Sequence, residues 1–236
     1  MTEVGDQLAG PAAKPWSSEG REELAAAVRR LMAVTVTSVA PPDLLADVAR
    51  QAAALADRLE SFVPEDGPVP IIRFSETTVH AEQADVLSAA MPFDVIIGSC
   101  NPIALPITIE FDPPKAVGRA HFTAPYEGAP GCVHGAVLAG AFDIILTAAN
   151  VIANGAGPTV NLSIKYLKPT LIGQPALFES WVTSKDDRRT HSRGHLVQNG
   201  VVTVEAVGEF VNMERSRIAA MHRRDDGAGP DSGGEA

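Results

Sequence analysis

The sequence predicts an α+β fold in which one long central helix is wrapped by an antiparallel β-sheet, with a helical extension at the N-terminus. Three observations predict it. The apolar segment 136–153 is interrupted by Asp143 and Asn150 and is otherwise largely apolar, which indicates a helix buried on most sides. Segments with the alternating pattern of half-buried strands lie before and after this helix. The chain ahead of residue 69 has helical periodicity instead.

Composition excludes several classes of function. Of the 236 residues, 45% are hydrophobic and 20% charged, which suits one ordinary domain with additions. The net charge of −10 argues against nucleic acid and anionic membranes as partners, because both need an excess of Lys and Arg. Two cysteines, Cys100 and Cys132, exclude a disulfide framework and a Cys-rich zinc site. The N-terminus lacks the basic start and apolar stretch of a secretory signal, so we expect a cytoplasmic protein.

The N-terminal part divides into a flexible lead over residues 1–16 and a helical extension over 17–68. A first helix is predicted over 19–38, and Pro41-Pro42 starts a second one. The apolar residues of the second helix are spaced alternately three and four apart: Leu45, Val48, Ala52, Leu55 and Leu59. This seam predicts a helical hairpin packed on the main domain, with a coiled-coil partner site as the alternative. A linker over 64–70 and a short helix over 75–90 follow.

The main domain is expected over residues 69–213, and a Gly- and Asp-rich flexible tail over 214–236. Two strands before the central helix form a hairpin around a Pro-Pro turn. Three or four strands follow the helix, and Asn199-Gly200 predicts a two-residue type I′ turn between the last two. The predicted strands are 105–111, 116–123, 159–167, 176–184, 192–198 and 201–211, with a charged turn over 185–189.

Asp143 is the first candidate for chemistry. A carboxylate in the middle of an apolar helix is costly to bury unless it is paired or protonated. It is either a structural residue that caps a strand or joins subunits, or a catalytic base. Thr147 lies one turn later on the same face and is a candidate partner.

The helix start at His134-Gly135 is the second candidate. The first N–H groups of a helix have no partner within the helix, and the helix dipole is positive there. A glycine lets a substrate approach those groups closely. Backbone donors aimed at a carbonyl that becomes an anion form an oxyanion hole. An ordinary turn glycine is the alternative interpretation.

Together these residues form a more specific pattern. The run Gly128-x-Pro-Gly-x-Val-His-Gly-Ala, with Asp143 eight residues after Gly135, resembles the acyl-CoA thioesterases of the hotdog fold, in particular their PaaI-like branch. The resemblance covers roughly residues 93–213. The strand motif Thr159-x-Asn161-Leu-x-Ile-x-Tyr166-x-x-Pro169 also looks like the strand that follows the helix in that family.

The resemblance implies a role for each matching residue. Gly135 would donate its N–H to the thioester carbonyl, and His134 would shape that corner. Asp143, from the opposite protomer, would activate a water or attack as a nucleophile. Thr159 would help to hold the water. The family forms homodimers or tetramers of hotdog dimers, uses acyl-CoA as substrate, and needs neither metal nor cofactor.

Two departures from the family pattern concern the same loop. Ala136 replaces the second glycine of His-Gly-Gly, and Gly128 stands where some relatives carry Asn or Gln. We expect Ala136, Asn161 and Arg193 to contact the substrate. Arg193 belongs to a basic group that is either a solvated turn or a seat for coenzyme A phosphates. That group comprises Lys185, Arg188, Arg189 and Arg193, and Lys165 and Lys168 are alternatives for the same role.

Other functions remain open at this point. A hotdog dimer that binds an acyl ligand without turnover is the main alternative, and an enoyl-CoA hydratase on the same fold is a third. Cys132 is close to the candidate site, but no base is evident beside it, so we expect a small buried residue. Missing Gly-x-Ser-x-Gly and Gly-x-Gly-x-x-Gly motifs argue against an α/β-hydrolase and a dinucleotide fold.

Overall fold

The computed structural model describes residues 20–63, 87–88, 91–155 and 157–213. The expected lead, the linker and the tail lie outside these residues. So does most of the helix predicted over 75–90, of which only Leu87 and Ser88 are described, and both are helical. The expected domain boundary at residue 69 also lies outside and stays a prediction.

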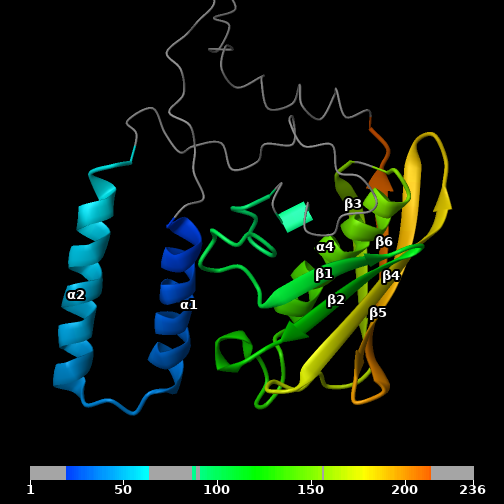
Figure 1. Cartoon of the computed structure of the whole chain (residues 1–236). Coiled ribbons are helices and arrows are strands. Elements are labelled where there is room, and N and C mark those ends of the chain that lie inside the picture. Colours follow the sequence, from blue (N-terminus) through cyan, green and yellow to red (C-terminus); the bar gives the residue numbers. More distant parts are fainter. Residues whose placement is uncertain (1–19, 64–86, 89–90, 156, 214–236) are drawn as a thin grey trace, which may run out of the picture.

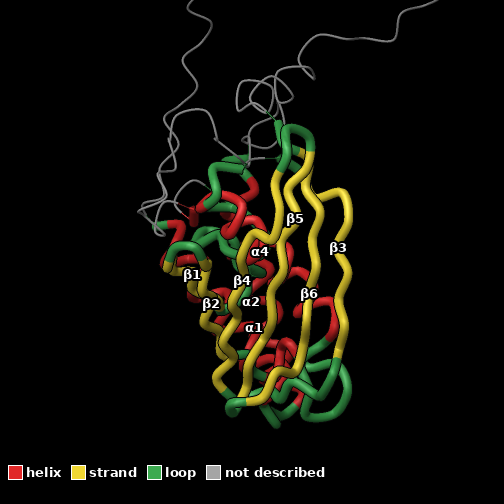
Figure 2. The backbone as a smooth tube through the Cα atoms, turned by 90° about the vertical axis from the view of Figure 1, so that its right-hand side faces the viewer, coloured by secondary structure: helices red, strands yellow, loops and turns green. Residues whose placement is uncertain are grey.

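Six strands form one antiparallel sheet in the order β1-β2-β4-β5-β6-β3 (Figure 2). The chain leaves β3 at one edge of the sheet and returns through β4 and β5 to β6, which pairs with β3. Their bounds are β1 Ile107–Asp112, β2 Lys115–His121, β3 Thr159–Tyr166, β4 Pro175–Lys185, β5 Arg189–Gln198 and β6 Val201–Val211. A short 3-10 helix, η1 (Ala124–Tyr126), follows β2.

The long helix α4 (Gly135–Ile152) lies against one face of this sheet. Glycines on that face permit close approach: a Cβ at Gly118 would lie 2.3 Å from Ile145 Cδ1, and one at Gly208 would lie 3.0 Å from Leu146 Cδ1. Within the described chain, α4 is the helix with the length and apolar composition of a membrane span, and half of it is buried in the domain. The predicted α+β hotdog architecture is confirmed.

The strand boundaries agree with the predicted ones to within about two residues, except in the hairpin formed by β4 and β5. There β5 begins at Arg189, three residues before the predicted start. Asp186 Oδ1 accepts the N–H groups of Arg188 and Arg189 at 2.7 and 2.8 Å, which closes the turn early. The same bonds hold the pKa of the Asp186 carboxyl below its ordinary value. The type I′ turn is confirmed, because Asn199 and Gly200 have φ of 52° and 74°.

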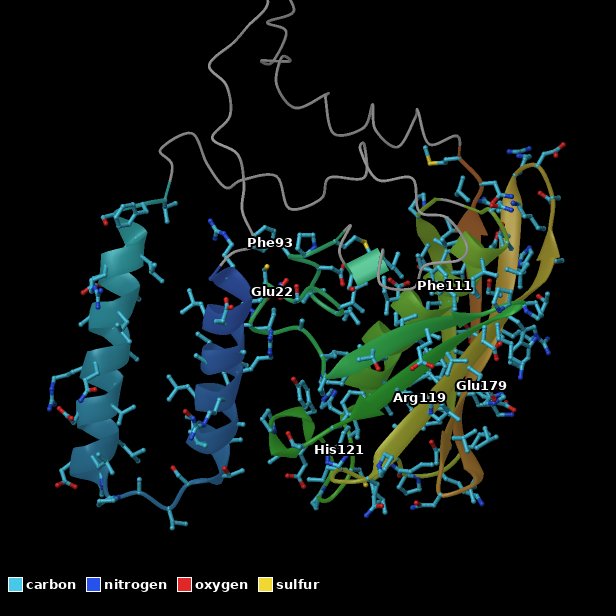
Figure 3. All side chains as sticks on the ribbon, in the orientation of Figure 1. Glu22, Phe93, Phe111, Arg119, His121 and Glu179 are labelled. Carbon is cyan, nitrogen blue, oxygen red and sulfur yellow. The ribbon has the colours of Figure 1, made fainter. Side chains whose placement is uncertain are left out.

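The N-terminal extension contains α1 (Arg21–Thr37) and α2 (Pro42–Glu60), and α1 is anchored on the domain. Its Ala25 is 2% exposed, and Arg29 Nη1 donates to the carbonyl of Asn101 at 2.7 Å. Glu22 accepts from Ser99 at 3.0 Å, on the side of α1 that faces Phe93 (Figure 3). By contrast α2 has no buried residue and is the outermost element (Figure 1). The predicted packing is therefore found for α1, whereas for α2 it is wrong.

Candidate active site

The loop ahead of α4 holds the start of the helix in place. His134 N–H donates to the carbonyl of Tyr126 at 2.8 Å, and Val133 N–H donates to that of Thr170 at 2.8 Å. Burial raises the pKa of the Tyr126 phenol above its ordinary value, despite the opposing effect of Arg29. These bonds tie the two residues ahead of α4 to two separate segments of the chain, so the helix start has a defined orientation.

His134 is the N-cap residue of α4. Its ring nitrogen Nδ1 accepts the N–H of Ala136 at 3.0 Å. An accepting Nδ1 leaves the proton of the neutral ring on Nε2. The predicted role of His134 at this corner therefore has a definite geometry. Ala136 has already given its N–H to His134, so it offers a substrate no backbone donor.

Gly135 keeps its backbone N–H free: within the described part of the chain this group makes no hydrogen bond. The carbonyl of the same peptide, that of His134, accepts from Val137 and Leu138 at 3.0 and 3.2 Å. One open donor thus remains at the positive end of the helix dipole. This is the donor that the sequence motif predicted.

Gly128 has no side chain because His134 fills the space. A Cβ at position 128 would lie 2.8 Å from His134 Cα and 2.9 Å from its Cδ2. The departure from the Asn or Gln of some relatives has a physical reason here, since a larger residue would displace the helix start.

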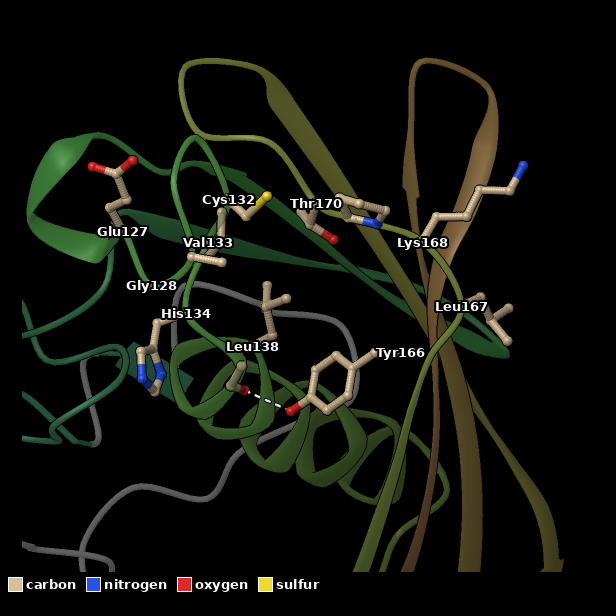
Figure 4. Close-up of a pocket in the computed structure, with 13 residues that line it drawn as sticks. Glu127, Gly128, Cys132, Val133, His134, Leu138, Tyr166, Leu167, Lys168 and Thr170 are labelled. Atoms are coloured by element: carbon tan, nitrogen blue, oxygen red, sulfur yellow. Dashed lines mark hydrogen bonds between the residues drawn. The ribbon is translucent and has the colours of Figure 1, made fainter.

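A pocket of about 710 Å³ opens at this end of α4 (Figure 4). Its wall contains the segment around Gly135 together with Tyr166 and Lys168 from the end of β3. Cys132 is half-buried and also lines the pocket, so the expectation of a small buried residue is wrong. Lys168, one of the alternative phosphate contacts, is the basic residue that this pocket contains.

Tyr166 is a site residue whose contact the sequence did not reveal. Its hydroxyl donates to the carbonyl of Gly135 at 2.7 Å (Figure 4). The two residues are 31 positions apart, so no local pattern connects them. The strand motif that contains Tyr166 was the available signal.

Asp143 lies two turns further along α4 and is half-buried. Thr159 Oγ1 donates to its Oδ1 at 2.8 Å, and the expected role of Thr159 in holding the water stays a prediction. Thr147, the alternative partner, donates instead to the backbone carbonyl of Asp143 at 2.8 Å. The eight residues from Gly135 to Asp143 correspond to about 12 Å along the helix. Within one chain, these two groups cannot act on the same carbonyl.

The other predicted substrate contacts lie elsewhere. Asn161 pairs with Glu209, and Arg193 pairs with Trp181 and Val207, and both side chains are exposed. In the alternation of β5, Arg193 is on the face opposite to the buried Ser192 and Gly194, which face α4. The structure therefore does not bring Arg193 to the pocket within one chain.

The rest of the basic group lies at the opposite end of α4. Lys185 Nζ donates to the carbonyls of Ala153 and Asn154 at 2.9 Å each, where it caps the helix. Arg189 pairs with Glu209 at 3.0 Å. Two of the four basic residues thus have local structural partners. Among the described residues, no cluster of His, Cys, Asp and Glu could hold a metal ion.

Comparisons with known proteins agree with this architecture. Residues 130–206 match the family model of the thioesterase superfamily. A crystal structure of a thioesterase superfamily protein is 26% identical and has a TM-score of 0.69 over 84% of this chain and 97% of its own. Such coverage exceeds the hotdog domain alone, so the similarity extends into the N-terminal part.

Two further structures match less than half of the chain. The PaaI protein of E. coli is 19% identical, with a TM-score of 0.44 over 47% of this chain and 81% of its own. A hypothetical thioesterase from Streptococcus pneumoniae TIGR4, solved with coenzyme A, is 18% identical, with a TM-score of 0.42 over 44% of this chain and 87% of its own. No curated protein sequence matches significantly. The family-model match over residues 130–206 and the 26% identical structure make this chain similar to proteins of the thioesterase superfamily, and both agree with the hotdog architecture described above.

Proposed function

We propose that this protein is an acyl-CoA thioesterase that hydrolyses its substrate at a site shared between two copies of the chain. The observation that carries the proposal is the free N–H of Gly135 at the start of α4, where its neighbouring donor is already engaged. A single preorganised donor of this kind contributes about 10²–10³ in rate to acyl transfer.

In the proposed reaction, a water attacks the thioester carbonyl and Asp143 takes its proton. The negative charge that develops on the carbonyl oxygen is stabilised by Gly135 N–H. When the C–S bond breaks, the proton passes to the sulfur of the leaving thiol. Thr159 occupies Oδ1 of Asp143, which leaves Oδ2 for the water. Direct attack by Asp143, followed by hydrolysis of the anhydride, uses the same groups.

A second copy is required because Gly135 and Asp143 are about 12 Å apart along one helix. The edge strand β3 supports such an assembly. It pairs with β6 on one side, its other edge is the end of the sheet, and its Val160 is 51% exposed. Free strand edges are prone to pair with another chain. A homodimer that joins here would bring the β3 and α4 of both copies together.

The test is the release of free thiol from a panel of acyl-CoAs, from acetyl to palmitoyl and including phenylacetyl and benzoyl. We expect wild-type release, and a loss of at least about 10²-fold in the Asp143→Asn variant. Asp112→Asn, at the exposed last residue of β1, is the matched control and should be unaffected. Full activity in a folded Asp143→Asn protein would contradict the mechanism. Coenzyme A binding without thiol release would support the non-catalytic binding protein instead.

A further inference from the structure

The first peptide of α4, between Gly135 and Ala136, is held on both sides by side chains. Its carbonyl accepts the hydroxyl of Tyr166 at 2.7 Å. Its N–H donates to His134 Nδ1 at 3.0 Å. The peptide plane cannot rotate without breaking one of these bonds, so both hydrogen bonds together fix its orientation.

This peptide adjoins the free donor. Gly135 N–H belongs to the preceding peptide, and only the Cα of Gly135 separates the two. A glycine has unusually wide freedom in both backbone torsions. The His134–Gly135 peptide is itself held at its carbonyl by the N–H groups of Val137 and Leu138. The hold on the Gly135–Ala136 peptide adds a second constraint on the Gly135 torsions, which set the direction of the free N–H.

We infer that Tyr166 is a positioning residue, which acts through its hydroxyl to aim Gly135 N–H at the carbonyl oxygen of a bound thioester. The inference rests on the proposed function. It goes beyond that function because it gives a role to Tyr166 on β3, which takes no part in the proposed reaction. It does not itself have to contact the reacting atoms.

The backbone that carries Tyr166 is rigid enough for this purpose. Tyr166 is the last residue of β3 and pairs with Val204 of β6. The two following N–H groups, those of Leu167 and Lys168, both donate to the carbonyl of Thr203 at 2.8 and 3.1 Å. The ring therefore projects from a backbone that β6 fixes on both sides of its Cα.

The contact is also close. A Cβ at Gly135 would lie 3.1 Å from Tyr166 Oη and 3.2 Å from its Cζ. Tyr166 remains 52% exposed, so burial of the ring alone does not explain its place. Its distinguishing feature is the hydroxyl on the Gly135 carbonyl, which a phenylalanine would lack.

The test compares Tyr166→Phe with Tyr126→Phe, the chain's two tyrosines. Tyr126→Phe is a matched control, because it keeps the backbone carbonyl that accepts the His134 N–H and removes only a hydroxyl that donates to the Ala104 carbonyl at 3.4 Å. For Tyr166→Phe we expect kcat to fall about 3- to 10-fold, with KM changed by less than about twofold. Tyr126→Phe should keep both constants within about twofold. An unchanged kcat in folded Tyr166→Phe would overturn the inference.

A second measurement separates failure of this inference from failure of the proposed function. If the wild type releases no thiol from any acyl-CoA, the proposed function fails. The hydroxyl is then tested by the backbone amide NMR signals of Gly135 and Ala136 in the free protein. Both signals should move and exchange faster with solvent in Tyr166→Phe, and should stay in place in Tyr126→Phe. Unchanged signals would overturn the positioning role whether or not the protein is an enzyme.

Discussion

Thr159 on the edge strand β3 donates its hydroxyl to Asp143 Oδ1 on the buried helix α4, over 2.8 Å. This bond selects one orientation of the carboxylate and leaves its second oxygen without a partner among the described residues. It also couples the two elements that a second copy would approach. The structure thus favours Thr159 over Thr147 as the residue that orients Asp143.

Removing the Thr159 hydroxyl should impair catalysis more than folding. We expect Thr159→Val to lower kcat about 10- to 100-fold, because a hydrogen bond to a charged group is lost. Thr159→Ser keeps the hydroxyl and should restore most of the rate. Thr183→Val removes an exposed hydroxyl that donates to His191 and is the control. Thiol release and thermal unfolding together check this, and equal rates for Thr159→Val and the control would contradict it.

The central helix could be predicted from local sequence because its ends carry local signals. His134-Gly135 marks its start and Asn154-Gly155 its end, and the observed helix ends within two residues of the prediction. The Asn199-Gly200 turn was predictable for the same reason, since two adjacent positive φ values demand such residues.

Contacts between distant parts of the chain could not be read in this way. No local sequence pattern specifies that β3 pairs with β6. The hydrogen bond from Tyr166 to the Gly135 carbonyl therefore could not be predicted from the sequence. The glycine at position 128 could be noticed as a departure, but its reason is a contact with the His134 ring. The apolar spacing in α2 correctly predicted a helix, but periodicity alone does not say whether another part of the protein packs against its apolar side chains.

The outer face of the sheet should contribute a pH-dependent part of stability. The Lys115 ammonium hydrogen-bonds to Glu179 at 2.9 Å and, with His195 at 2.9 Å, holds the pKa of that carboxyl below its ordinary value of 4.5. A lowered pKa stabilises the fold above about pH 5, and this contribution is lost as the pH falls through the folded-state value.

We therefore expect Glu179→Gln to lower the free energy of unfolding at neutral pH, by no more than about 1 kcal/mol because the pair is partly exposed. The difference from wild type should shrink as the pH falls below 4.5. Urea unfolding across this pH range measures it. Glu110→Gln, which breaks a longer 3.6 Å pair of two exposed side chains, is the control. A difference that grows as the pH falls below 4.5 would contradict the assignment.

Arg29 should hold α1 on the domain. Its guanidinium donates to the carbonyls of Asn101 and Ser99 at 2.7 and 3.4 Å. In Arg29→Ala, we expect faster backbone hydrogen exchange over α1, because these two bonds are lost. The neighbouring Arg30 is exposed and makes no such contact among the described residues, so Arg30→Ala is a matched control. Equal exchange in both variants would show that Arg29 does not anchor the helix.

The shared site makes the strongest prediction, which concerns mixtures of two inactive variants. Gly135→Pro removes the free N–H, and proline is tolerated at the first position of a helix. Asp143→Asn removes the base. If each site takes Gly135 from one copy and Asp143 from the other, a mixed dimer has one intact site and one with both defects. Random mixing makes half of the dimers mixed, so the mixture should recover about one quarter of wild-type activity.

A site built from one chain could not recover this activity, because every chain in the mixture carries one of the two defects. Each variant must be inactive alone, and the two must exchange subunits, which mass measurement of differently tagged copies verifies. A double variant, Gly135→Pro with Asp143→Asn, mixed with wild type is the control, since its mixed dimers contain two half-defective sites and should be inactive. If mixed dimers of the single variants form and release no thiol, the two groups do not complement each other across an interface. Because Gly135 and Asp143 of one chain lie about 12 Å apart along the helix, the reaction would then need a different catalytic pair.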